Sequence, residues 1–326
     1  MATTVIEGQE VATSLGPGPL EEGGAECERL RDELLSGAGF FLARGVLPPE
    51  RAERCRRLCE ARGRQPPYKG GLKARILNLL DLDDAFGENL LALDARVGPV
   101  LRAVMGPRCF LTTYHCFTLN PEGGGPYRPS VRADLNDFTD AEIDEGFEPA
   151  GESSRGDALV RRRPRLSPEQ VRTAWGHDAH TDRPFPTVNT IIMLSPFTGR
   201  GGATRLLRNT WPEHRQPRES PEDRQRFIEG SIPAVGEPGD VLVYVGETWH
   251  CEGVNLAEVP RVALLGGWLP ESWSNNRQHH PDPTRPDWGD PARLRQLPPA
   301  VAELLGWDRE SGRERPSQVP LQEPRL

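Results

Sequence analysis

Residues 239–250 read GDVLVYVGETWH, and residues 261–269 read RVALLGGWL. Each stretch is a short apolar run bounded by glycine, proline or polar residues, which is typical of a buried β-strand. Residues 187–194 and 202–207 show the same pattern. Because these strands are separated by glycine turns rather than by helices, we expect an antiparallel sandwich or barrel and not a Rossmann fold.

The amino-terminal part of the chain adds helices to this β-rich core. Residues 26–35, 48–61 and 90–105 carry apolar side chains at helical spacing or begin with helix-start signals. Residues 109–119 read CFLTTYHCFTL, a run rich in threonine and aromatic residues that indicates one more strand. The predicted fold class is therefore mainly β with flanking helices.

The chain divides into three predicted regions. Residues 1–20 are polar and rich in glycine and proline, so we expect a flexible arm, followed by one domain over residues 21–270. Residues 271–326 form a proline-rich extension that we expect to pack on this domain. Within the domain, residues 121–174 form an insertion that carries seven carboxylates between positions 134 and 148. This insertion is either a solvated surface excursion or a lid over the site.

Composition excludes several classes of function and partner. The chain has 326 residues, 34 glycines, 33 prolines and a formal net charge of −8, whereas nucleic-acid-binding proteins are usually basic. No apolar run approaches the length of a membrane span, and the first residues lack the pattern of a signal peptide. The six cysteines form no CxxC pair. We therefore expect a cytoplasmic monomer or homodimer that acts on a small molecule, without nucleic-acid or membrane partners.

Two histidines and one aspartate have the pattern of a metal site. His180 and Asp182 are two positions apart, so in an extended segment their side chains point to the same side. His250 follows an apolar strand about 70 residues later. Two histidines and one carboxylate occupy one face of an octahedral ion and leave three positions open, which is the arrangement of non-haem Fe(II) oxygenases.

Arg261 lies eleven residues after His250 and begins the last apolar strand. A charged side chain in such a strand needs a partner, because burying an unpaired guanidinium is unfavourable. The fork of the guanidinium fits a carboxylate with two hydrogen bonds. Arg261 is therefore a candidate carboxylate-binding residue, and an edge-strand arginine that reaches water is the alternative.

At this point the sequence resembles the phytanoyl-CoA dioxygenase branch of the Fe(II)- and 2-oxoglutarate-dependent oxygenases. The resemblance lies in the His180–Asp182 pair, the run GGATRLL at 201–207, the Trp249-His250 dipeptide and the eleven-residue interval to Arg261. It extends over about residues 25–270. It implies a double-stranded β-helix, also called a jelly roll, supported by helices.

The resemblance also implies a role for each matching residue. Fe(II) would be held by His180, Asp182 and His250, and Arg261 would hold the distal carboxylate of 2-oxoglutarate, with O2 as co-substrate. The chain departs from the branch at Asn120, where many members have lysine, and at Glu252, where many have serine or threonine. The remaining hydrogen bonds to 2-oxoglutarate are therefore predicted to come from Thr204, Asn189 and Asn120.

The expected reaction is hydroxylation or oxidative cyclisation of a small molecule, and we expect a secondary metabolite. If the acidic segment covers the site, its charge would suit an aminoglycoside or another sugar-containing antibiotic intermediate, with ring closure to an orthoester as one form of the cyclisation. Two alternatives remain open. One is a non-redox cupin-type metalloenzyme, and the other is a non-catalytic sensor that binds 2-oxoglutarate on the same fold.

Overall fold

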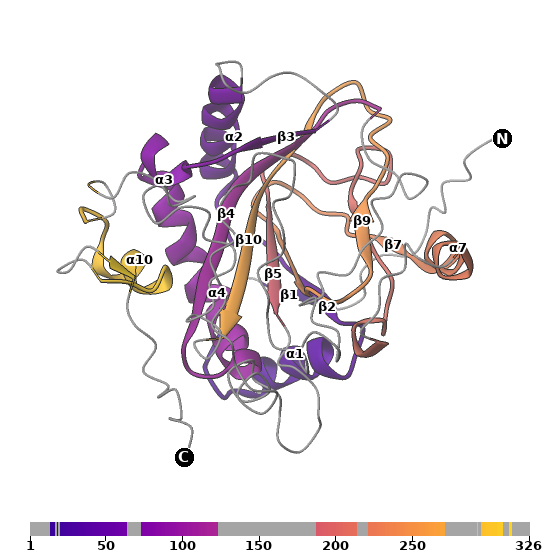
Figure 1. Ribbon diagram of the computed structural model, residues 1–326, viewed down its shortest axis with the longest axis horizontal. Coiled ribbons are helices and arrows are strands. Elements are labelled where there is room, and N and C mark those ends of the chain that lie inside the picture. Colours follow the sequence, from indigo (N-terminus) through magenta and orange to yellow (C-terminus); the bar gives the residue numbers. More distant parts are fainter. Residues whose placement is uncertain are drawn as a thin grey trace, which may run out of the picture.

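The computed structural model describes residues 14–16, 18, 20–63, 73–122, 187–213, 221–270, 292, 295–308 and 313–314. A seven-stranded sheet dominates this part of the chain (Figure 1). In their order across the sheet, its strands are β1 (Ser14–Leu15), β2 (Phe40–Ala43), β8 (Val241–Val245), β5 (Val188–Met193), β10 (Arg261–Pro270), β4 (Cys109–Leu119) and β3 (Lys73–Ile76). All neighbours pair antiparallel except β1 and β2, which are parallel.

A second, three-stranded sheet faces the first. Its strands are, in order, β7 (Ile232–Pro233), β6 (Thr204–Leu206) and β9 (His250–Glu252). Apolar side chains from both sheets form one buried cluster between them, including Leu206 and Ile232 from the small sheet and Ile191 and Leu242 from the large one. The prediction of a mainly β, jelly-roll core with flanking helices is confirmed.

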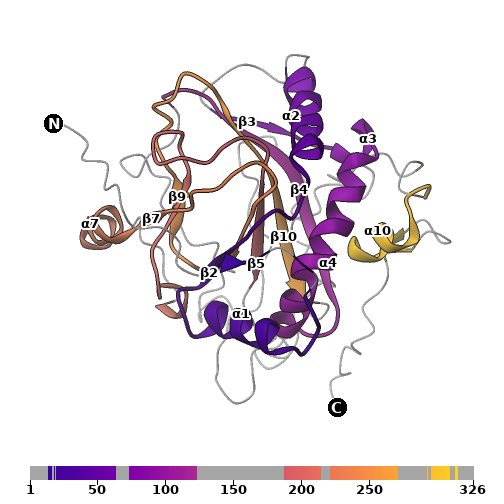
Figure 2. The same ribbon diagram turned by 180° about the vertical axis from the view of Figure 1, so that it is seen from behind.

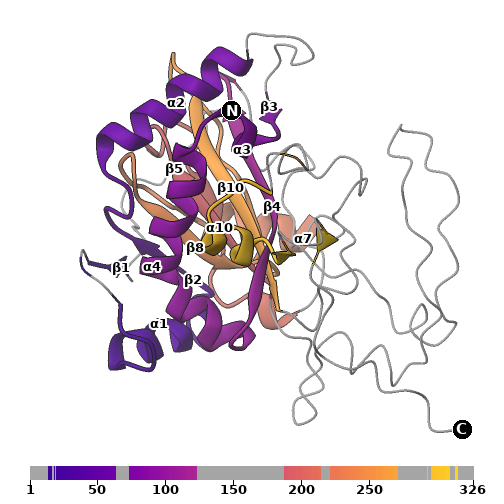
Figure 3. The same cartoon turned by 90° about the vertical axis from the view of Figure 1, so that its left-hand side faces the viewer.

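Helices cover the outer face of the large sheet. These are α1 (Ala25–Leu35), α2 (Pro49–Gly63), α3 (Leu79–Leu82) and α4 (Ala85–Met105), and α4 runs alongside β4 (Figures 2 and 3). Helix α7 (Pro221–Gly230) lies beside the small sheet instead, and a short 3₁₀ helix occupies Trp211–Glu213. Among the described residues, no helix combines the length and the apolar character that a membrane span requires.

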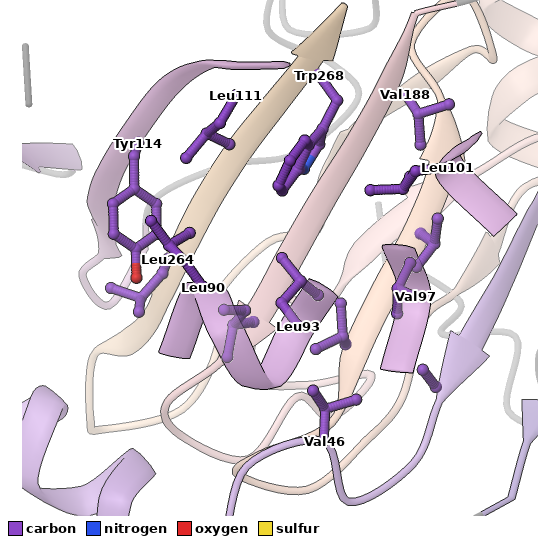
Figure 4. Packing of buried hydrophobic residues seen from close by; sticks show 14 of the residues in the cluster. Val46, Leu90, Leu93, Val97, Leu101, Leu111, Tyr114, Val188, Leu264 and Trp268 are labelled. Carbon is purple, nitrogen blue, oxygen red and sulfur yellow. The ribbon is translucent and has the colours of Figure 1, made fainter. Parts of the chain in front are cut away.

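The periodicity of α4 explains how this helix layer attaches. Leu90, Leu93, Val97 and Leu101 lie along one stripe of the helix and face the sheet, as Figure 4 shows. They pack against side chains from the outer face of the sheet, among them Leu111, Tyr114, Leu264 and Trp268. Burial of each such side chain contributes about 1.5–3 kcal/mol, so this contact is a main source of stability.

Alternation along β4 then assigns the neighbouring residues to the inner face. Tyr114 and Cys116 point to the helices, and His115 and Phe117 therefore point to the space between the sheets. The same alternation in β10 puts Leu264 outside and Arg261, Ala263 and Leu265 inside. The inner face of the large sheet is thus the surface on which a site can form.

Several predicted elements agree closely with the structure. Strand β4 has the predicted bounds, and α1, α2, α4, β5, β6, β8 and β10 lie within a few residues of their predicted ranges. Strand β3 and helix α7 were not predicted, because β3 has only four residues and α7 is strongly charged. The insertion at 123–174 lies outside the described residues.

Both ends of the chain include described elements. Ser14 and Leu15 pair with β2, although residues 1–20 were expected to be a flexible arm. In the carboxy-terminal region, α10 (Pro299–Leu304) packs on α4 through Val301 and Ala302, next to the short hairpin of β11 (Trp307–Asp308) and β12 (Arg313–Glu314). The predicted division into three regions stays a prediction.

Candidate active site

Arg261 is the first residue of β10 and one of the most deeply buried charged residues in the described part of the chain. It pairs with Leu119 of β4, and its side chain is 3% exposed. Because Val262 and Leu264 point to the helix layer, alternation directs Arg261 into the space between the sheets. An edge-strand arginine that reaches water is therefore not what the structure shows.

The guanidinium of Arg261 has a polar side and an aromatic side. Its Nη1 donates to the carbonyl oxygen of Gly202 at 3.1 Å and to Oγ1 of Thr204 at 3.2 Å. The rings of Phe197 and Phe117 lie 4.6 and 5.5 Å from its central carbon, at the distance of cation–π contacts. These contacts fix the orientation of the side chain and bring the predicted Thr204 to Arg261.

The charge of Arg261 is incompletely compensated by the described residues. Its Nε has no hydrogen-bond partner among them, and no carboxylate there forms an ion pair with it. Burial lowers the pKa of Arg261 to about 10, although the negative charge of Glu252 opposes this shift. A buried guanidinium with an unused donor can accept an anion, and its fork geometry suits a carboxylate.

His250, the first residue of β9, lies on the inner face of the small sheet. Its ring is buried and packs edge-on against Tyr244 of β8, with the ring centroids 4.9 Å apart. Its Nδ1 lies 2.8 Å from the carbonyl oxygen of Thr248, which can only accept, so Nδ1 is the donor. In the neutral ring Nε2 then carries the lone pair. A backbone carbonyl that orients the ring in this way is typical of metal-binding histidines.

The two predicted asparagines occupy different positions. Asn189 of β5 faces the inner side, opposite Gly267 of β10 and Tyr244 of β8. Since Tyr244 also contacts His250, Asn189 lies on the same part of the inner face as that ring. Asn120 lies one residue beyond the end of β4. The roles of both residues in binding 2-oxoglutarate stay predictions.

The other two predicted metal ligands, His180 and Asp182, lie outside the described residues. Within the part of the chain that is described, no group of three histidine, cysteine, aspartate or glutamate side chains could hold a metal ion. The described ligand candidate, His250, presents an Nε2 lone pair that could bind a metal ion. The complete triad stays a prediction.

Sequence reasoning missed the residues that complete the surroundings of Arg261. Phe117 and Phe197 supply the aromatic contacts, but an aromatic residue in or beside a strand gives no signal for that role. Lys73 forms an ion pair with Glu252, its Nζ lying 3.1 Å from Oε2. The presence of a glutamate two residues after His250 was the one signal that could have directed attention to this pair.

Comparison with known sequences identifies related dioxygenases. No protein-family model matches the chain. The chain is 27% identical over 127 residues to the dioxygenase andF of Emericella variicolor, which covers 38% of this chain and 39% of that protein. It is 28% identical over 139 residues to the iron/alpha-ketoglutarate-dependent dioxygenase penM of Penicillium thymicola, covering 43% and 39%. Each match thus covers less than half the length of these curated relatives.

A solved structure has the same fold. The crystal structure of HygX from Streptomyces hygroscopicus, with nickel, 2-oxoglutarate and hygromycin B bound, superposes with a TM-score of 0.51 at 17% identity. The superposition covers 76% of this chain and 87% of that one. At this identity the comparison concerns the fold, and it agrees with the jelly roll formed by the two sheets.

Proposed function

We propose that the chain is a member of the Fe(II)- and 2-oxoglutarate-dependent oxygenases and that it oxidises a small molecule, a proposal that its relatives and its fold support. Its cofactor would be Fe(II), and 2-oxoglutarate and O2 would be its co-substrates. Membership of the phytanoyl-CoA dioxygenase branch stays a prediction. The penM relative carries the name of an iron- and alpha-ketoglutarate-dependent enzyme, and alpha-ketoglutarate is another name for 2-oxoglutarate.

The observation that supports this proposal best is the buried guanidinium of Arg261. It is oriented by Thr204 and Gly202, and it has an unused Nε donor and no ion-paired carboxylate among the described residues. The distal carboxylate of 2-oxoglutarate would compensate this charge. A protein without an anionic ligand would gain nothing from burying such a group.

The remaining site residues would bind either the metal ion or the co-substrate. His250, His180 and Asp182 would hold Fe(II), and the carbonyl of Thr248 keeps the His250 ring in the metal-binding tautomer. Asn189 and Asn120 are the further candidates for contacts with 2-oxoglutarate. Iron, when bound, supplies oxidative decarboxylation of 2-oxoglutarate to succinate and hydrogen abstraction from the substrate. The packed apolar cluster between the two sheets keeps water from this chemistry.

The substrate class is a further part of the proposal. We propose a secondary metabolite that is hydroxylated or oxidatively cyclised, with aminoglycosides and other sugar-containing antibiotic intermediates as the first candidates, including orthoester formation. The HygX structure, which was crystallised with hygromycin B, supports the inclusion of that compound in a first screen. The carboxylates at 134–148, such as Asp140 and Glu142, lie outside the described residues, and their role as a lid is part of this proposal.

The proposal also covers the cellular location and the partners of the protein. We place it in the cytoplasm as a monomer or homodimer, without nucleic-acid or membrane partners. All six cysteines are free, and desolvation raises the pKa of the buried Cys55 thiol and of the partly buried Cys109 thiol, that of Cys109 to about 12. Thiols of this kind are unreactive and need no oxidising compartment.

The test is oxygen-dependent turnover by the reconstituted protein. The protein is loaded anaerobically with Fe(II) and 2-oxoglutarate, mixed with a candidate substrate, and exposed to air while succinate and product are measured. We expect succinate release that rises with the correct substrate and disappears in His250→Gln. Tight 2-oxoglutarate binding without succinate from any substrate would favour a sensor. Metal-dependent conversion that ignores both 2-oxoglutarate and O2 would favour a non-redox cupin-type enzyme.

A further inference from the structure

Lys73 and Arg261 occupy one row of the large sheet. Leu119 of β4 pairs with Lys73 of β3 on one side and with Arg261 of β10 on the other. Residues that pair directly across antiparallel strands have side chains on the same face. The two cationic side chains therefore point to the inner face from either side of Leu119.

Glu252 of the small sheet faces the same space. It pairs with Thr204, whose hydroxyl accepts a hydrogen bond from Arg261, so the side chains of Glu252 and Thr204 lie on one face. The Glu252 side chain is 11% exposed, and its Oε2 lies 3.1 Å from Nζ of Lys73. Its charge also acts on Arg261, because it opposes the lowering of the Arg261 pKa by burial.

This arrangement creates a competition for the guanidinium. The Glu252 carboxylate, whose charge acts on Arg261, has the same chemistry as the carboxylate that Arg261 would bind in 2-oxoglutarate. The ion pair with Lys73 offsets part of the charge of Glu252, so the loss of Lys73 would strengthen the attraction between Glu252 and Arg261. The net charge of the three side chains would also fall from +1 to 0, which weakens attraction for a dianion.

We propose that Lys73 is a positioning residue for the co-substrate: it holds the Glu252 carboxylate in an ion pair, so that Arg261 stays available for the distal carboxylate of 2-oxoglutarate. This inference rests on the proposed function and concerns the affinity for 2-oxoglutarate. It implies that Glu252 is an internal competitor rather than a ligand of the co-substrate.

The test measures binding of 2-oxoglutarate to the nickel-loaded full chain by titration calorimetry, without turnover. We expect Lys73→Met to weaken binding about tenfold and Lys73→Arg to retain it. Glu252→Gln should bind 2-oxoglutarate at least as tightly as the wild type, because the competitor is neutral. In the Glu252→Gln background, Lys73→Met should then have no further effect.

A matched control is Arg75→Met. Arg75 lies two residues along β3 on the same face, so its substitution also removes one positive charge, but it forms no ion pair with a described carboxylate. Its 2-oxoglutarate affinity should stay within about twofold of the wild type, since it does not compensate Glu252. Denaturation curves of all variants show whether each is folded at the temperature of the titration.

The possible results distinguish a failure of the proposed function from a failure of the role given to Lys73. A wild type that does not bind 2-oxoglutarate would overturn the proposed function and this inference together. Binding by the wild type that is unchanged in Lys73→Met, or that is lost in Glu252→Gln, would overturn only the role given to Lys73. Equal losses in Lys73→Met and Arg75→Met would show a general charge effect and would overturn it as well.

Discussion

Replacement of Arg261 by methionine should weaken ligand affinity strongly but change the stability of the ligand-free protein little. Methionine retains an unbranched apolar side chain but removes the charge and its donors. Breaking a buried ion pair by removing one partner typically costs about 3–5 kcal/mol, which corresponds to a loss of affinity of roughly 10²-fold to several thousandfold. We therefore expect Arg261→Met to lose most of its affinity for 2-oxoglutarate.

The ligand-free protein should respond differently to the same substitution. Burial lowers the pKa of Arg261 from 12.5 to about 10, so keeping the guanidinium charged costs about 3 kcal/mol at neutral pH. Methionine removes this penalty but also removes the hydrogen bonds to Gly202 and Thr204 and the contact with Phe197, together worth about 2–5 kcal/mol. The two effects nearly cancel, so the free energy of unfolding should stay within about 2 kcal/mol of the wild type.

Chemical denaturation of the nickel-loaded protein with and without 2-oxoglutarate measures both effects. At a ligand concentration of 100 times its Kd, the wild type should be stabilised by about 2.7 kcal/mol, and Arg261→Met at the same concentration by less than about 0.4 kcal/mol. Arg205→Met is the control, because Arg205 is also partly buried but bonds to Ser231 on the other side of β6. A ligand-free Arg261→Met protein that is destabilised by much more than about 2 kcal/mol, or one that still binds 2-oxoglutarate normally, would refute the reasoning.

Two further predictions concern His115 and a tight turn. Burial, with the charge of Arg75, lowers the pKa of His115 from 6.5 to about 4, so below pH 6.5 the unfolded state takes up a proton that the folded state does not. The free energy of unfolding should therefore fall as the pH drops from 6.5 to 4, by about 3 kcal/mol more in the wild type than in His115→Gln. Urea denaturation of both proteins across this pH range measures the difference. Parallel curves for the two proteins would contradict this prediction. Gly239→Ala should destabilise the protein by roughly 3 kcal/mol or more, because φ is +96° and a Cβ would lie 2.1 Å from the carbonyl oxygen of Leu47. Gly106→Ala, with φ of +95° but no atom near its Cβ, should lose only about 1 kcal/mol by thermal denaturation, and equal losses would disprove the clash.

The sequence was informative wherever a local pattern carries the physical information. Short apolar runs bounded by glycine turns predicted the strands that contain Val243 and Leu264, and helical spacing predicted α4. A histidine that follows an apolar strand and a short turn, and an arginine at the start of the next apolar strand, marked His250 and Arg261 as unusual. Both signals are local, because a strand imposes the same alternation whatever its neighbours are.

The contacts around the site depended on which strands become neighbours. Thr204 meets Arg261, and Lys73 meets Glu252, only because β6 and β9 of the small sheet face β10 and β3 of the large one. Sequence alternation states that a side chain points to one side of a strand, but it does not state which distant strand lies opposite. The tertiary structure alone therefore decided which residues orient the guanidinium of Arg261, and that Glu252 and its partner Lys73 lie in the same space.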